Sequence, residues 1–221
     1  MRTLDSNSAA ILKPPAAGYV RYGFGGEGMP PDLHDAAVSA ALWVFIGVAT
    51  SLFLLFLAAY GMRMDAGDWS PLAMPWQLWL SSGLLLLASV LLQLAATAAG
   101  TLHLRRARSL LAAAGVCGVA FLGVQLWGWQ ALLAIHVTAS GNPAASFFYL
   151  LTAMHGLHVT GGLVGWGMAA HGAWRQDASR LARRIRLCAR YWHFLLALWV
   201  LLFAALGWLT PELVRMVCGT R

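Results

Sequence analysis

Two histidines one helical turn apart stand out in an otherwise apolar part of the sequence. His155 and His158 lie in the stretch 146–162. Neutral histidine is the commonest metal ligand, and residues at i and i+3 of a helix share a face, so the pair could bind a metal ion or a haem iron. The alternative is that both histidines form hydrogen bonds with neighbouring helices.

The remaining residues do not complete a metal or haem site. His193 lies near the start of a later apolar run, so its depth along the helices differs from that of His158 by roughly 10 Å at 1.5 Å per residue. A two-haem cytochrome needs four well-placed axial histidines, but His136 and His171 lie at the ends of apolar runs. The three cysteines have no CxxC spacing. We therefore expect no metal or cofactor in this chain and assign the histidines to hydrogen bonding.

The composition is that of a membrane protein. Hydrophobic residues make up 60% of the 221 positions and charged residues only 10%, whereas charged residues make up about 25% of ordinary soluble domains. This composition excludes a disordered chain, a disulfide scaffold and an ordinary cytosolic enzyme. The net charge of +7 would suggest a nucleic-acid partner in a soluble chain. Here the basic residues lie between apolar runs, so they indicate orientation in a bilayer and no nucleic-acid partner.

Five apolar runs are long enough to cross a hydrocarbon core of about 30 Å as helices. The prediction is therefore an all-α bundle of five transmembrane helices, preceded by a tail 1–35 that is either flexible or docked on a partner. A five-helix domain covers 36–210, and a short tail 211–221 follows it. The predicted spans are 36–60, 75–99, 110–135, 145–170 and 189–209.

The basic residues predict the topology. Of the 15 Lys and Arg residues, 12 lie in alternate segments that would share one side of the membrane, and three lie in the segments of the other side. The positive-inside rule then places the N-terminus in the cytoplasm and the C-terminus in the periplasm of a bacterial inner membrane. All eight acidic residues lie outside the runs, so autonomous ion transport, which needs an ionisable relay, is not expected.

Small and aromatic residues in the last two runs predict helix packing. Gly161 and Gly165 form a small-xxx-small pair that allows another helix to approach closely, and Gly162 shares a face with His155. Near its start the fifth run carries Tyr191, followed by a tryptophan and a histidine, which is typical of membrane entry.

Two longer motifs resemble subunit III of the haem-copper respiratory oxidases, in its short five-helix bacterial form. The first is FFYLLTAMHGLHV at 147–159, followed by a glycine-rich stretch, and the second is YWHF at 191–194 with Trp199 downstream. The resemblance covers about residues 36–209. The residues it suggests for helix packing and lipid contact are His155, His158, Gly161, Gly162, Gly165, Tyr191, Trp192, His193 and Trp199.

The resemblance implies a non-catalytic subunit that carries no cofactor of its own. It would pack against subunits I and II, stabilise subunit I and hold membrane phospholipid. Haem and copper would belong to subunit I, with copper or haem in subunit II of a cytochrome c oxidase. The complex would transfer electrons from cytochrome c or quinol to dioxygen and translocate protons.

The sequence departs from the family pattern at two positions. Family members often carry an acid where this chain has Ala49, and an aspartate where it has Leu196. Both changes remove intramembrane carboxylates, whereas histidine hydrogen bonding and helix packing can persist without them. Two other functions stay open from the sequence: an accessory subunit of a nitric oxide reductase and a stand-alone b-type membrane cytochrome.

Overall fold

The computed structural model of the protein describes residues 31–64, 69, 72, 74–138, 141–173 and 178–209, with side chains from residue 36 onward. Each of its five helices is long and apolar enough to cross a membrane, which confirms the predicted all-α, five-span bundle. The predicted tails lie outside the described residues, except that 31–35 begin the first helix. The helices are α1 (Pro31–Arg63), α2 (Gln77–Gly100), α3 (Leu104–Ala134), α4 (Pro143–Gly172) and α5 (Ala178–Trp208).

Helices α1, α3, α4 and α5 begin earlier than the apolar runs predict, and α5 does so by the largest margin. Helix α5 begins at Ala178, well before the predicted span at 189, and α3 begins at Leu104 rather than at 110. In the first turns of α5, Leu181 and Ile185 are buried against the bundle, while arginines occupy other faces of the helix. This amphipathic extension carries the helix beyond the stretch that is apolar on all sides.

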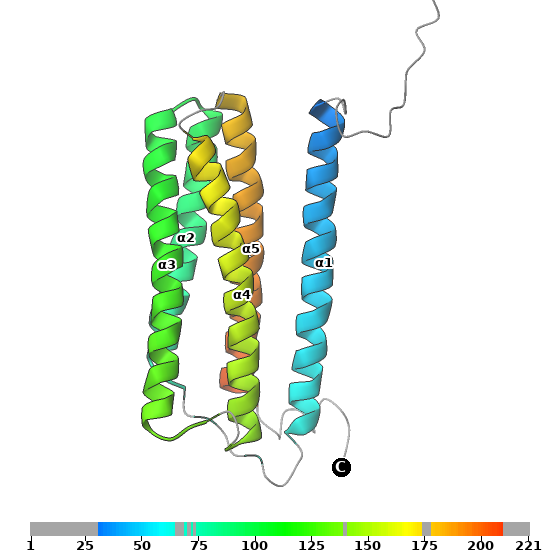
Figure 1. The fold of residues 1–221 in the computed structure, drawn as a ribbon, viewed down its shortest axis with the longest axis vertical. Helices are drawn as coiled ribbons and strands as arrows, with labels where there is room; N and C mark the ends of the chain where they lie inside the picture. The colour runs from blue at the N-terminus through cyan, green and yellow to red at the C-terminus, as the bar shows by residue number, and fades with distance from the viewer. Residues whose placement is uncertain are drawn as a thin grey trace, which may run out of the picture.

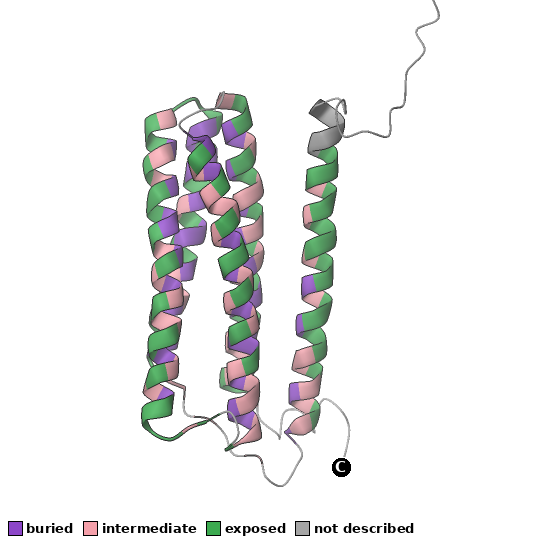
Figure 2. Cartoon of the chain, viewed as in Figure 1, coloured by how far each residue is buried: buried purple, intermediate pink, exposed green. Residues whose placement is uncertain are grey.

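Helices α2 to α5 form a four-helix bundle, and α1 lies along one side of it (Figure 1). Helix α2 packs most extensively against α3, and α1 packs chiefly against α4 and α5. Buried positions line the interior of the bundle, whereas α1 is largely exposed (Figure 2). Only 11% of the most apolar stretch of α1 is buried, compared with 28% to 39% in the other four helices.

Helix α1 is attached to the bundle by aromatic contacts. The rings of Phe45 and Phe53 have their centroids 5.9 Å and 5.3 Å from that of His158 in α4. Nearer the end of α1, the ring of Tyr60 meets Phe147 edge to face at 5.6 Å. These contacts fix α1 against α4 at two levels.

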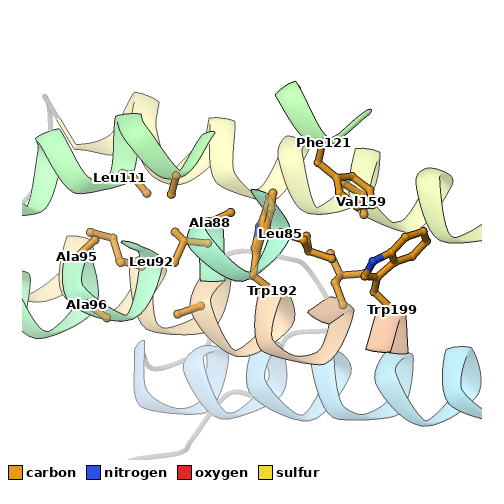
Figure 3. Packing of buried hydrophobic residues seen from close by; sticks show 14 of the residues in the cluster. Leu85, Ala88, Leu92, Ala95, Ala96, Leu111, Phe121, Val159, Trp192 and Trp199 are labelled. Atoms are coloured by element: carbon orange, nitrogen blue, oxygen red, sulfur yellow. The ribbon is translucent and has the colours of Figure 1, made fainter. Parts of the chain in front are cut away.

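Glycines and tryptophans fit together inside the bundle. A side chain at Gly118 would collide with the ring of Trp192, and one at Gly115 would collide with Trp166. Trp166 also donates a hydrogen bond from Nε1 to the Leu111 carbonyl oxygen at 2.7 Å, which anchors α4 to α3. The ring of Trp192 lies in the packed core, and Leu85 and Ala88 of α2 are nearby (Figure 3).

Adding one methyl group to α3 tests this fit. We expect Gly118→Ala to lower the free energy of unfolding by about 1–3 kcal/mol, because the buried ring of Trp192 must shift. The midpoint of thermal unfolding in detergent measures the effect. Gly123→Ala is the matched control, since nothing lies within 4 Å of the added atom in the described structure, and alanine favours the helix. Equal midpoints for the two variants would contradict this account of the core.

Candidate functional site

His155 occupies the centre of the bundle. Helix α4 starts with an Asn142 side chain that accepts a hydrogen bond from the Ala144 backbone N–H at 3.0 Å, and His155 follows on its buried face. The imidazole is 0% exposed and lies 5.0 Å from the ring of Trp199 and 5.8 Å from that of Phe121, measured between centroids. Neither ring nitrogen has a hydrogen-bond partner among the described residues. His155 therefore contributes packing, and the hydrogen bond expected to a neighbouring helix is not formed there.

Tryptophan side chains form polar contacts between helices instead, by donating hydrogen bonds to serine and threonine hydroxyls. Trp199 donates from Nε1 to the Ser82 hydroxyl at 2.8 Å, which joins α5 to α2. Trp129 donates to the Thr152 hydroxyl at 3.2 Å, which joins α3 to α4. Sequence reasoning named Trp199 as a packing residue but gave Ser82 no packing role. A serine inside an apolar run can serve as the acceptor that a buried indole N–H needs.

His158 faces a different neighbour. Its Nδ1 lies 2.7 Å from the Met154 carbonyl oxygen of its own helix, and its ring contacts Phe45 and Phe53 of α1. Tyr191 donates a hydrogen bond to the His158 carbonyl oxygen at 3.0 Å. His155 thus packs inside the bundle and His158 packs toward α1. Among the described residues no group of three His, Cys, Asp or Glu side chains is placed to hold a metal ion.

Two neighbouring residues of α5 have opposite environments. Trp192 is fully buried, whereas His193 is exposed and its Nδ1 lies 2.5 Å from the Ala189 carbonyl oxygen. His193 lines a groove of about 780 Å³ between α1, α2 and α5, which we call the α2 groove. Its lining residues are Leu42, Trp43, Ile46, Gln93, Ala96, Thr97, Gly100, Arg186, Ala189, Arg190, His193 and Phe194.

A second groove, the α4 groove, has a volume of about 510 Å³ and lies between α1, α4 and α5. Gly162 and Gly165 line it. Nothing in the described structure lies within 4 Å of a Cβ atom added at Gly165. A Cβ atom added at Gly161 would have the Tyr191 hydroxyl oxygen as its nearest neighbour, at 4.0 Å. The close approach predicted for Gly161 and Gly165 is therefore not made by another described helix. Instead Gly162 meets α5, with Leu195 at 3.1 Å from such an added atom.

The two positions at which the sequence departs from the pattern it resembles differ in environment. Ala49 is 3% exposed and lies on α1 between Phe45 and Phe53, the residues whose rings contact His158. Leu196 is half-buried and packs against the core of the bundle. Both positions therefore carry apolar contacts in this chain.

The chain is similar to curated proteins of one kind. It is 25% identical over 178 residues to the "Cytochrome bo(3) ubiquinol oxidase subunit 3" of Pseudomonas aeruginosa, which is 77% of this chain and 85% of the relative. It is 28% identical over 168 residues to the "Cytochrome c oxidase subunit 3" of Alkalihalophilus pseudofirmus, covering 73% and 81% of the two chains. A "Probable cytochrome c oxidase subunit 3" of Mycobacterium leprae is 31% identical over 90 residues, or 40% of this chain and 45% of the relative. No protein-family model matches the chain.

Replacing the central histidine tests whether it contributes only packing. We expect His155→Phe to preserve or raise the thermal midpoint in detergent, because it removes two buried nitrogens without partners. Leaving such a polar group unsatisfied costs about 1–3 kcal/mol. His158→Phe is the comparison, since it removes an imidazole that already has a partner in Met154. A clear loss of stability in His155→Phe alone would show that His155 has a polar partner.

Proposed function

We infer that this chain is a member of the subunit III family of the haem-copper respiratory oxidases, and we propose that it is a non-catalytic integral subunit of such an oxidase. Relatives with this name cover much of both chains at modest identity. The five apolar helices are consistent with the short form of the family. The observation that carries the proposal is this similarity, together with histidines that serve packing rather than converge on a common site.

We assign the redox centres to partner chains. Haem and copper would be held by subunit I, with copper or haem in subunit II if cytochrome c is the donor. His155 is enclosed by aromatic rings, and His158 packs on α1, so neither is arranged as an axial ligand opposite another histidine. This chain would stabilise subunit I while the complex transfers electrons to dioxygen and translocates protons. The relatives include both a ubiquinol oxidase and a cytochrome c oxidase subunit, so cytochrome c and quinol both remain candidate donors.

We propose a bacterial inner membrane with the N-terminus of the chain in the cytoplasm. Helices α1, α3 and α5 all begin at the same end of the structure (Figure 1). Arginines are concentrated in the first turns of α3 and α5. The positive-inside rule assigns this arginine-rich end to the cytoplasm.

The similarity does not favour the two other functions that the sequence left open. Each relative reported above is named as an oxidase subunit, and none of those names refers to nitric oxide. A stand-alone b-type cytochrome would need paired axial histidines, and His155 and His158 pack in different directions.

Purification of the intact complex tests the proposed function. The chain is tagged at its C-terminus and extracted from native membranes in mild detergent, and a reduced-minus-oxidised spectrum is recorded. We expect haem and a large haem-copper subunit to co-purify, and the preparation to consume oxygen. Consumption of nitric oxide instead would indicate the reductase. The proposal would be wrong if no haem-copper subunit were present, or if the isolated chain held haem that His155→Ala removed.

We further propose that the α4 groove holds membrane phospholipid. Most of its lining is apolar, and Arg183, Arg184 and His171 supply cationic or polar groups. Arg184 also donates a hydrogen bond to the Met168 carbonyl oxygen at 3.5 Å, so this arginine is positioned at the end of α4. An acyl chain lying along Gly165 would contact residues that otherwise border an open groove.

Filling the α4 groove tests the lipid proposal. We expect Gly165→Phe to reduce the number of phospholipids that native mass spectrometry detects on the purified complex, because the ring occupies the space beside Gly165. Gly167→Phe is the matched control, since it lies in the same helix, has nothing within 4 Å and does not line the groove. Equal lipid retention in the two variants would argue against a lipid in this groove.

A further inference from the structure

Two rows of polar side chains face the α2 groove. The third wall, contributed by α1, is apolar and includes Trp43, which is 61% exposed. The rows comprise Gln93 and Thr97 on α2, and Arg186, Arg190 and His193 on α5. Within each row the residues recur at helical spacings of three or four, so they share one face of their helix.

The rows run along the helix axes, from the arginine-rich end of the bundle toward the middle of the membrane. Helix α2 ends, and α5 begins, at that same end (Figure 1). His193 lies two turns beyond Arg186 along α5, which is about 10 Å deeper at 1.5 Å per residue. Gln93 lies equally far below Gly100, the last residue of α2. The groove is therefore cationic near the helix ends and neutral but polar further in.

These side chains keep unused hydrogen-bonding capacity within the described structure. The Gln93 amide has no partner among the described residues, and His193 uses Nδ1 toward Ala189, which leaves Nε2 available. Residues 69–173 and 178–209 contain no Asp or Glu. Helices α2 to α5 therefore offer Arg186 and Arg190 no carboxylate. Polar groups at membrane depth normally face protein or a water-filled cavity.

We propose that the α2 groove receives a transmembrane helix of a partner chain. That helix carries an acidic side chain at the level of Arg186 and Arg190, and an uncharged polar side chain beside Gln93 and His193. Along α5, His193 lies about one turn beyond Arg190 and two turns beyond Arg186. Arginine pairs with a carboxylate through charge-assisted hydrogen bonds, and amide and imidazole side chains bond well across helices. The inference rests on the proposed function and adds the surface through which the chain meets its oxidase.

A helix fits both levels of the groove better than a phospholipid does. A lipid phosphate bound between Arg186 and Arg190 would send its acyl chains toward the deeper level, leaving Gln93 and His193 in hydrocarbon. Unpaired polar groups are costly in that environment. Side chains on one face of a helix recur about every 5.4 Å, so a single helix supplies partners at both depths.

Site-specific cross-linking in the holo-complex tests the occupant. A photoreactive phenylalanine analogue is placed at Thr97, which lines the groove, and in a control chain at Ala112, which is exposed on α3. We expect Thr97 to cross-link to a transmembrane helix of the haem-copper subunit that bears an acidic residue, and Ala112 not to cross-link to that helix. Adducts at Thr97 that contain phospholipid only, or no adduct, would overturn the inference.

Removing the deeper polar pair tests its contribution. We expect Gln93→Leu with His193→Leu to lower recovery of the haem-copper subunit roughly tenfold in stringent detergent, or about threefold per hydrogen bond lost. Gln130→Leu, an exposed glutamine on α3, is the control and should leave recovery unchanged. If the double variant recovered as much haem-copper subunit as the wild type, the proposed docking surface would be wrong, but the proposed function would stand. Absence of any haem-copper subunit from the wild-type preparation would overturn the proposed function as well.

Discussion

The bundle depends on tryptophan rings that occupy the space left by glycines. Helix association inside a bilayer gains little from the hydrophobic effect, because lipid chains are as apolar as leucine, so close packing must supply the stabilisation. Trp192 lies against Gly118 of α3 and close to Gly162 of α4, so one α5 side chain unites three helices. The same ring fixes the rotation of α5, which directs Leu195 into the core and leaves His193 outside.

Helix α1 packs against the bundle in a different way. It meets α4 and α5 through phenylalanine and tyrosine rings rather than through glycine contacts, and rings hold helices further apart than glycines do. Grooves therefore remain on both sides of α1, one along α2 and one along α4. The bundle supplies rigidity, and the more loosely packed α1 supplies surfaces on which lipid or another chain can bind.

The sequence was sufficient for the number and type of helices but not for their mutual contacts. Hydropathy identifies each span because every apolar residue contributes independently to transfer into lipid, but it stops at arginines such as Arg183 even where α5 continues. Helical spacing placed His155 and Gly162 on one face of their helix, and both residues are buried. It could not reveal that Trp199 and Phe121 surround the ring, or that Gly162 rather than Gly165 meets α5, since those facts depend on the rotation of neighbouring helices.

The apolar side chains of Ala49 and Leu196 limit where charged side chains occur in the spans. Ala49 is buried and lies one turn of α1 from each of Phe45 and Phe53, whose rings contact His158. A carboxylate there would have to be desolvated or paired with that imidazole. With alanine, the contact between α1 and α4 is aromatic and uncharged. Residues 36–64 also contain no acid, so the charged side chains of the described spans are all arginines. Four of them, in α5, border the two grooves. The contacts inside the bundle are thus largely apolar and aromatic, and the charged side chains lie at its grooves and helix ends.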